Sequence, residues 1–168
     1  MCDIQKMKDN STINNMDFTD CDMKGLVIQD NTFTRCKFNE VNLTNAKLKN
    51  IKFIRVHFDG IEFMYANLDN VSIKKCVFSE IDFTGANMTK VNLKNAVLMG
   101  AVFRGAVLAK SYFQDADLRG ADFMGATFNV VLFDRALLTD AKLNEVISTD
   151  SSFDSANFNN ANLTEFIE

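Results

Sequence analysis

The sequence predicts an all-β fold, a parallel β-helix with four-sided coils, and three features of the chain point to it. A large apolar residue recurs at every fifth position, a small residue recurs two positions before it, and proline is absent from all 168 residues. Proline lacks the N–H group that a β-ladder needs. Its absence is therefore typical of a chain in which almost every residue lies in one repeated, hydrogen-bonded pattern.

The large apolar position, here called the centre, keeps its spacing from Ile13 to Leu163 without an insertion or deletion. Thirty of these 31 centres are Ile, Leu, Met or Phe, the exception being Ser148, and 15 of the 16 phenylalanines lie at them. Five steps turn a helix by about 140° beyond a full turn and reverse the face of a flat strand, so neither gives one apolar side. The chain must instead turn a corner once in every five-residue unit.

Four such corners close a coil after twenty residues, so residues twenty apart should stack along a rod. Two aromatic columns are then predicted at the centres, Phe18, Phe38, Phe58 and Phe78 in one and Phe63, Phe83, Phe103 and Phe123 in the other. Thirteen of the 14 alanines fall two residues before a centre, here called the small position, because the interior is narrow. The small core residues predicted from this spacing are Ala66, Ala86, Ala101, Ala106, Ala116, Ala121 and Ala126.

The two ends of the rod need separate treatment, because a solenoid exposes its terminal coils. We expect an N-terminal cap over residues 1–10, the β-helix over 11–165, and a C-terminal end over 166–168 that leaves the repeat. Either Phe166 folds over its own coil, or two rods meet end to end as a homodimer. The predicted dimer contact consists of Phe153, Phe158, Leu163, Phe166 and Ile167. At the polar centre Ser148, the expected irregularity is a local bulge, or a gap that a partner fills.

Signals for catalysis are nearly absent from the sequence. His57 is the only histidine and lies next to a centre, where side chains should point outward. The cysteines have no metal-binding spacing, and the glycines fall at corners, where a positive φ favours them. We therefore expect no enzyme activity, no metal and no cofactor. No apolar run is long enough to span a membrane, and no secretory signal is recognisable, so a cytoplasmic protein without membrane contact is expected.

What remains is the outer surface, whose charge is uneven. Residues 1–110 hold 15 basic and 12 acidic residues, whereas residues 111–168 hold three basic and ten acidic ones. The net charge of −4 argues against direct binding of nucleic acid. The predicted acidic surface consists of Asp115, Asp117, Asp122, Asp134 and Asp140. A competing feature is an apolar collar on four successive sides of the rod, formed by Val97, Val102, Val107 and Tyr112.

The repeat resembles that of the pentapeptide-repeat family, whose unit is A(D/N)LXX. "ANLDN" at Ala66, "ADLRG" at Ala116, "ADFMG" at Ala121 and "ANLTE" at Ala161 carry the resemblance, which covers residues 11–165. It implies a right-handed quadrilateral β-helix, here of about eight coils without interrupting loops.

Within that family the chain is similar to the quinolone-resistance pentapeptide proteins, Qnr and MfpA. The similarity implies a rod that dimerises through its C-terminal end and binds type II topoisomerase, DNA gyrase or topoisomerase IV, by mimicking DNA. The chain lacks the loops of Gram-negative Qnr proteins, a feature that it shares with MfpA, and its charge is mild for a DNA mimic. The alternative is a generic scaffold that binds an unidentified protein through the apolar collar or the acidic C-terminal third.

Overall fold

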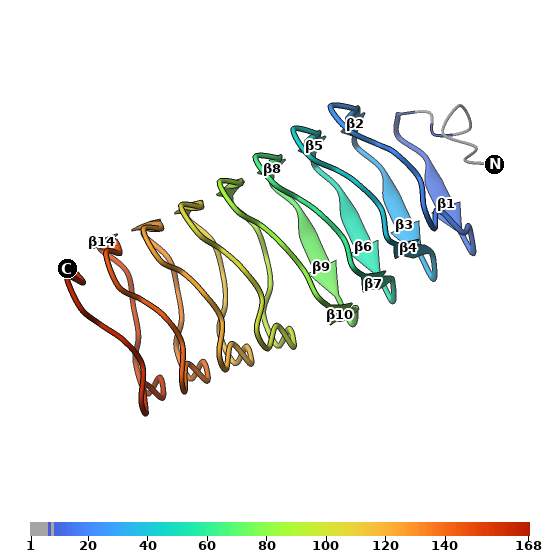
Figure 1. Ribbon diagram of the computed structural model, residues 1–168. Coiled ribbons are helices and arrows are strands. Elements are labelled where there is room, and N and C mark those ends of the chain that lie inside the picture. Colours follow the sequence, from blue (N-terminus) through green and yellow to red (C-terminus); the bar gives the residue numbers. More distant parts are fainter. Residues whose placement is uncertain (1–6, 8) are drawn as a thin grey trace.

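The chain forms a rod of stacked four-sided coils in a computed structural model that describes residue 7 and residues 9–168 (Figure 1). Successive coils pair in parallel between residues twenty apart, from Thr12↔Thr32 near one end to Ile147↔Ile167 at the other. The predicted all-β parallel β-helix is thus confirmed. The cap predicted over residues 1–10 lies largely outside the described residues.

Every strand is three residues long, with the centre in its middle pointing inward. The first side of the rod carries β1 (Thr12–Asn14), β3 (Thr32–Thr34), β6 (Lys52–Ile54) and β9 (Ser72–Lys74), and the second carries β4 (Lys37–Asn39), β7 (His57–Asp59) and β10 (Val77–Ser79). The third side has isolated bridges such as Asp22↔Asn42. The fourth side carries a seven-stranded sheet, β2 (Val27–Gln29), β5 (Lys47–Lys49), β8 (Asn67–Asp69), β11 (Asn87–Thr89), β12 (Val107–Ala109), β13 (Thr127–Asn129) and β14 (Ile147–Thr149).

The interior is filled by columns of centres, as the spacing predicts. On the third side the rings of Phe63, Phe83, Phe103 and Phe123 stack almost parallel, with successive centroids 5.1, 5.0 and 4.5 Å apart. Each of these side chains is fully buried. The seven alanines predicted at small positions are also buried beside them. Apolar burial of this kind contributes about 1.5–3 kcal/mol for each large side chain and holds the coils together.

Each corner contains a residue in the left-handed region of backbone space. The last residue of every described unit has a positive φ, between 51° and 68°, and all seven glycines stand at this position. At Gly85 the absence of a side chain matters twice, because an added Cβ would also lie 2.5 Å from the ring carbon Cδ1 of Tyr65. Glycine adopts this conformation without the steric cost that other residues incur.

The residue at the small position decides how tightly a corner closes. All 13 alanines at small positions donate their amide to the carbonyl of the preceding centre, as Ala106 does to Phe103 at 3.0 Å. This bond closes a tight β-turn whose third residue has positive φ. At several β-branched residues the corner stays open and the amide bonds to a side chain one coil further on. Val91, for example, donates to the hydroxyl of Ser111 at 3.0 Å.

Open and tight corners meet in the middle of the rod. On the first two sides the corners from Cys36 to Ile81 are open and those from Ala96 onward are tight, so unlike corners stack there. The earlier corner at Cys21 is tight, because its amide donates to the Phe18 carbonyl at 3.0 Å. Within the described chain, no backbone hydrogen bond joins residues 75–80 to residues 94–99, and pairing resumes at Asp82↔Val102. We call this interruption the seam. It leaves Phe78 half-buried, which corrects the prediction that this centre is fully enclosed.

The C-terminal end corrects two further expectations. Phe166 donates its amide to the Leu163 carbonyl at 3.1 Å, and Ile167 pairs with Ile147, so both stay in the repeat. A phenylalanine fits the small position here because no further coil encloses it. The bulge expected at Ser148 is also absent, since this residue pairs with Phe128 in regular register. Its buried hydroxyl has no hydrogen-bond partner among the residues that the structure describes.

Candidate interaction surface

The last coil leaves its inward side chains uncovered. Phe153, Phe158 and Phe166 are half-buried and Leu163 is 45% exposed. Ile167 is 60% exposed at the outward position that pairs with Ile147. The corresponding centres one coil earlier, such as Phe133, are fully buried because another coil covers them. These five exposed or half-exposed residues are those predicted as the dimer contact.

The uncovered side chains form a connected apolar plate. The Phe153 ring stacks on that of Phe133 at 5.1 Å, and its centroid lies 5.6 Å from that of Phe158 and 6.1 Å from that of Phe166. A hollow of about 530 Å³ opens over these rings and over Leu163. Because the coil is the last, its backbone also presents an unpaired strand edge, which is a template for pairing with another chain.

The predicted acidic surface is partly neutralised by its neighbours. Asp115 pairs with Arg135 and Asp117 with Arg119, each at 2.6 Å. The Asp122 carboxylate lies 2.7 Å from Arg104 and also contacts Lys142. Asp122 is only 5% exposed, which corrects its assignment to the surface, because the basic side chains from the neighbouring coils cover it.

These ion pairs keep the three carboxylates charged while compensating their charge. The Arg135 guanidinium holds the pKa of Asp115 below its usual value, and Arg119 does the same for the pKa of Asp117. Burial raises the pKa of Asp122, but hydrogen bonds from Arg104, the Met124 amide and Lys142 outweigh it, so the pKa is lowered overall. At neutral pH each carboxylate is an ion-pair partner and offers little charge to a ligand.

Uncompensated negative charge lies closer to the C-terminal end than the sequence suggested. Asp134 accepts a hydrogen bond from Ser152, and Asp140 is exposed. Further acidic side chains around the last two coils are exposed and have no ion pair in the described part of the chain. They are Glu145, Asp150, Asp154, Glu165 and Glu168.

The apolar collar is distributed around the rod. Val97, Val107 and Tyr112 are exposed and Val102 is half-buried, each on a different side, so one flat partner cannot cover all four. Sequence reasoning missed Val77, which is 57% exposed on the second side, one coil before Val97 (54% exposed). Their spacing of twenty residues was the signal that could have revealed this apolar pair.

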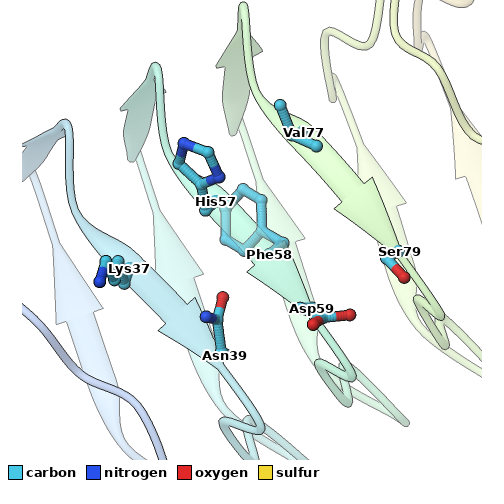
Figure 2. Close-up of a pocket in the computed structure, with 7 residues that line it drawn as sticks. All are labelled: Lys37, Asn39, His57, Phe58, Asp59, Val77 and Ser79. Carbon is cyan, nitrogen blue, oxygen red and sulfur yellow. The ribbon is translucent and has the colours of Figure 1, made fainter.

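His57 lies in a shallow hollow of about 270 Å³ on the second side (Figure 2). Its neighbours on β4, β7 and β10 include Asp59 and Ser79, the residue types of a hydrolase triad. Figure 2 shows His57 and Asp59 at opposite ends of their strand segment, and no hydrogen bond among the described residues links them. The arrangement therefore provides no relay from a carboxylate through an imidazole to a hydroxyl.

Two other kinds of site were sought in the described residues. No group of three or more His, Cys, Asp or Glu side chains is placed to hold a metal ion there. Nor does any helix in that part of the chain have the length and apolar character required to cross a bilayer.

Several solved structures of pentapeptide-repeat proteins are similar to this rod. A pentapeptide repeat structure that is similar to the rod is HetL, involved in heterocyst differentiation regulation, from Nostoc sp. strain PCC 7120. The two sequences are 16% identical, the match covers 95% of this chain and 85% of HetL, and the TM-score is 0.50. Trypsin-treated QnrB1, a plasmid-mediated fluoroquinolone resistance protein, is 21% identical to this chain. The match covers 92% of this chain and 83% of QnrB1, with a TM-score of 0.45. No curated protein sequence matches the chain.

Family models match nearly the whole repeat region. A model described as "Pentapeptide repeat region" matches residues 27–103 and 69–143. A second, "Pentapeptide repeats (8 copies)", matches residues 132–167. Together with the fold, these matches identify the chain as a member of the pentapeptide-repeat family.

Proposed function

We propose that the protein is a non-catalytic, protein-binding rod that forms a homodimer through its C-terminal coil. The observation that carries this proposal is the uncovered apolar plate of the last coil, with Leu163 exposed beside half-buried phenylalanine rings and the exposed Ile167 at its edge. A second copy, related by a two-fold axis, would place the same plate opposite it. Burying several such side chains contributes about 1.5–3 kcal/mol each and would also pair the free strand edges.

The dimer would bring two sets of exposed carboxylates together. Asp140, Asp154 and Glu165 lie near the end of each rod and have no ion pair. A concentrated negative field attracts basic, DNA-binding surfaces and raises their rate of association. We propose type II topoisomerase, DNA gyrase or topoisomerase IV, as the partner, bound by mimicry of DNA in the cytoplasm without direct contact to nucleic acid or membrane.

A generic scaffold role is the second candidate, favoured by a different observation. Val77, Val97 and Met99 are exposed close together on the second side, away from the acidic end. An apolar group of this kind can mark a contact with another protein. In that case the acidic carboxylates would serve solubility alone, and the partner would be an unidentified protein.

Purified protein is expected to inhibit DNA supercoiling by gyrase at micromolar concentrations. The charge reversals Asp140→Lys and Asp154→Lys together should abolish the inhibition, because they remove exposed charge without breaking an ion pair. Asp20→Lys with Glu80→Lys is the matched control, since both are exposed acidic residues far from the C-terminal coil.

The supercoiling assay separates the two candidates. Inhibition that survives the Asp140 and Asp154 reversals but is lost in Val97→Glu would favour the apolar group on the second side. A complete lack of inhibition by the unmodified protein would contradict the topoisomerase proposal and leave the dimeric rod as a scaffold.

A further inference from the structure

The seam carries a hollow on the first side of the rod. Its volume is about 510 Å³, which is sufficient for a small molecule with several polar groups. Lys74 and Lys75 line it from the coil before the seam. Asn92, Lys94 and Asn95 line it from the coil after the seam, so an occupant would touch both halves of the rod.

The charge around this hollow is entirely positive. Three lysines line it and no carboxylate does. The first-side units over residues 11–95 add three further exposed cations, Arg35, Lys52 and Arg55, and contain no Asp or Glu. None of these six cations has an ion pair in the described part of the chain. Lys94 has a nearby carboxylate, Asp115 of the next coil, and its ammonium lies 5.0 Å from the centre of the Tyr112 ring. The first side up to residue 95 is nevertheless a positively charged region on a protein with a net charge of −4.

Polar groups around the hollow are oriented as donors. The Asn92 side-chain oxygen accepts a hydrogen bond from the Lys94 amide at 3.2 Å, which leaves the NH₂ group of Asn92 to donate outward. At equivalent corners the backbone amide donates a hydrogen bond to a carbonyl oxygen of the next coil, as the Arg55 amide does to the Lys74 carbonyl at 3.0 Å. The Lys75 amide has no such bond because the seam interrupts the pairing, so it adds a further donor.

We propose that the seam hollow binds a small anion with several phosphate groups, held by Lys74, Lys75 and Lys94 and by the Asn92 amide. Three ammonium groups and several N–H donors without a carboxylate match the charge and the acceptor oxygens of such an anion. The volume favours linked phosphate groups over a single one. The site is independent of the acidic C-terminal end, and its ligand would bridge the seam where backbone hydrogen bonds are missing.

Thermal unfolding with inorganic tripolyphosphate tests the proposal. A ligand that binds only the folded rod raises its unfolding temperature. We expect tripolyphosphate to raise the midpoint of the unmodified protein by at least about 2 °C relative to sodium chloride of equal ionic strength. Lys74→Gln with Lys94→Gln should remove the increase. Lys47→Gln with Lys49→Gln, which removes two exposed lysines from β5 on the fourth side, should retain it.

Calorimetric titration distinguishes the source of the phosphate groups. Tripolyphosphate should bind the unmodified protein at least tenfold more tightly than it binds the Lys74/Lys94 double variant. A short single-stranded oligonucleotide should not displace it. Three results would overturn the proposal: no effect of tripolyphosphate on the unmodified protein, an equal effect on both double variants, or binding of the oligonucleotide alone.

Discussion

Replacing Phe103 with alanine is expected to lower the free energy of unfolding by about 3–5 kcal/mol. The Phe103 ring lies between those of Phe83 and Phe123, with centroids 5.0 and 4.5 Å away, and contacts Phe113 edge-on at 5.9 Å. Its removal leaves a cavity that the stacked coils cannot collapse to fill, because the backbone ladders fix their spacing. Urea unfolding followed by circular dichroism would measure the loss.

Phe78→Ala provides the matched control for this substitution. Phe78 is a centre beside the seam, where it is half-buried, and its ring stacks on that of Phe58 with centroids 5.2 Å apart. Its replacement should cost less than half as much as that of Phe103. Equal losses at the two sites would show that stability does not follow the enclosure of the centre by neighbouring coils.

Replacing Ala101 with phenylalanine is expected to disrupt the rod. Ala101 is buried at a small position, and its amide closes a tight corner by bonding to the Leu98 carbonyl at 3.1 Å. Overpacking a well-filled core typically costs about 1–3 kcal/mol, and more where the backbone cannot move aside. Here the coil would have to widen, which its pairing on both sides opposes. The cooperative thermal transition should disappear or shift to a much lower temperature.

Ala109→Phe separates overpacking from the presence of an added aromatic ring. Ala109 is the alanine that lies outside the small positions, and its side chain is half-buried on the outer surface of β12. The ring can extend into solvent there, so unfolding should be nearly unchanged. A near-normal transition for Ala101→Phe would contradict the narrow core on which the five-residue period depends.

The sequence could predict the architecture because a narrow core restricts nearly every unit in the same way. Leu118 and its equivalents have to be large, and Ala116 and its equivalents have to be small, so the period is visible in the residues themselves. Corners were recognisable for a similar reason: glycines such as Gly85 adopt the positive φ that every unit needs. The twenty-residue pairing then followed from the closure of four corners.

Features that depend on contacts between neighbouring coils could not be predicted in the same way. Asp122 occupies an outward position, but its burial depends on Arg104 and Lys142 from the neighbouring coils. The seam arises because open corners stack on tight ones, a difference in hydrogen bonding that the period does not reveal. Phe166 stands at a small position in which its ring is only half-buried, which the local pattern does not reveal.

We therefore expect functional residues at positions that the packing of the rod does not constrain. Centres and small positions are set by packing and carry little information about partners. The uncovered last coil, the exposed carboxylates around it and the cationic first side are all outside that constraint, and each could change without altering the rod. We propose self-association through the first of these surfaces, which is the most apolar.

Sedimentation equilibrium at tens of micromolar protein tests this central claim most directly. The unmodified protein should have the mass of two chains, and Leu163→Glu, which places a charge in the apolar plate, should have the mass of one. Val27→Glu, which changes an exposed apolar residue of β2 on the same fourth side but far from the last coil, should remain dimeric. A single-chain mass for the unmodified protein, or an unchanged dimer after Leu163→Glu, would contradict the account.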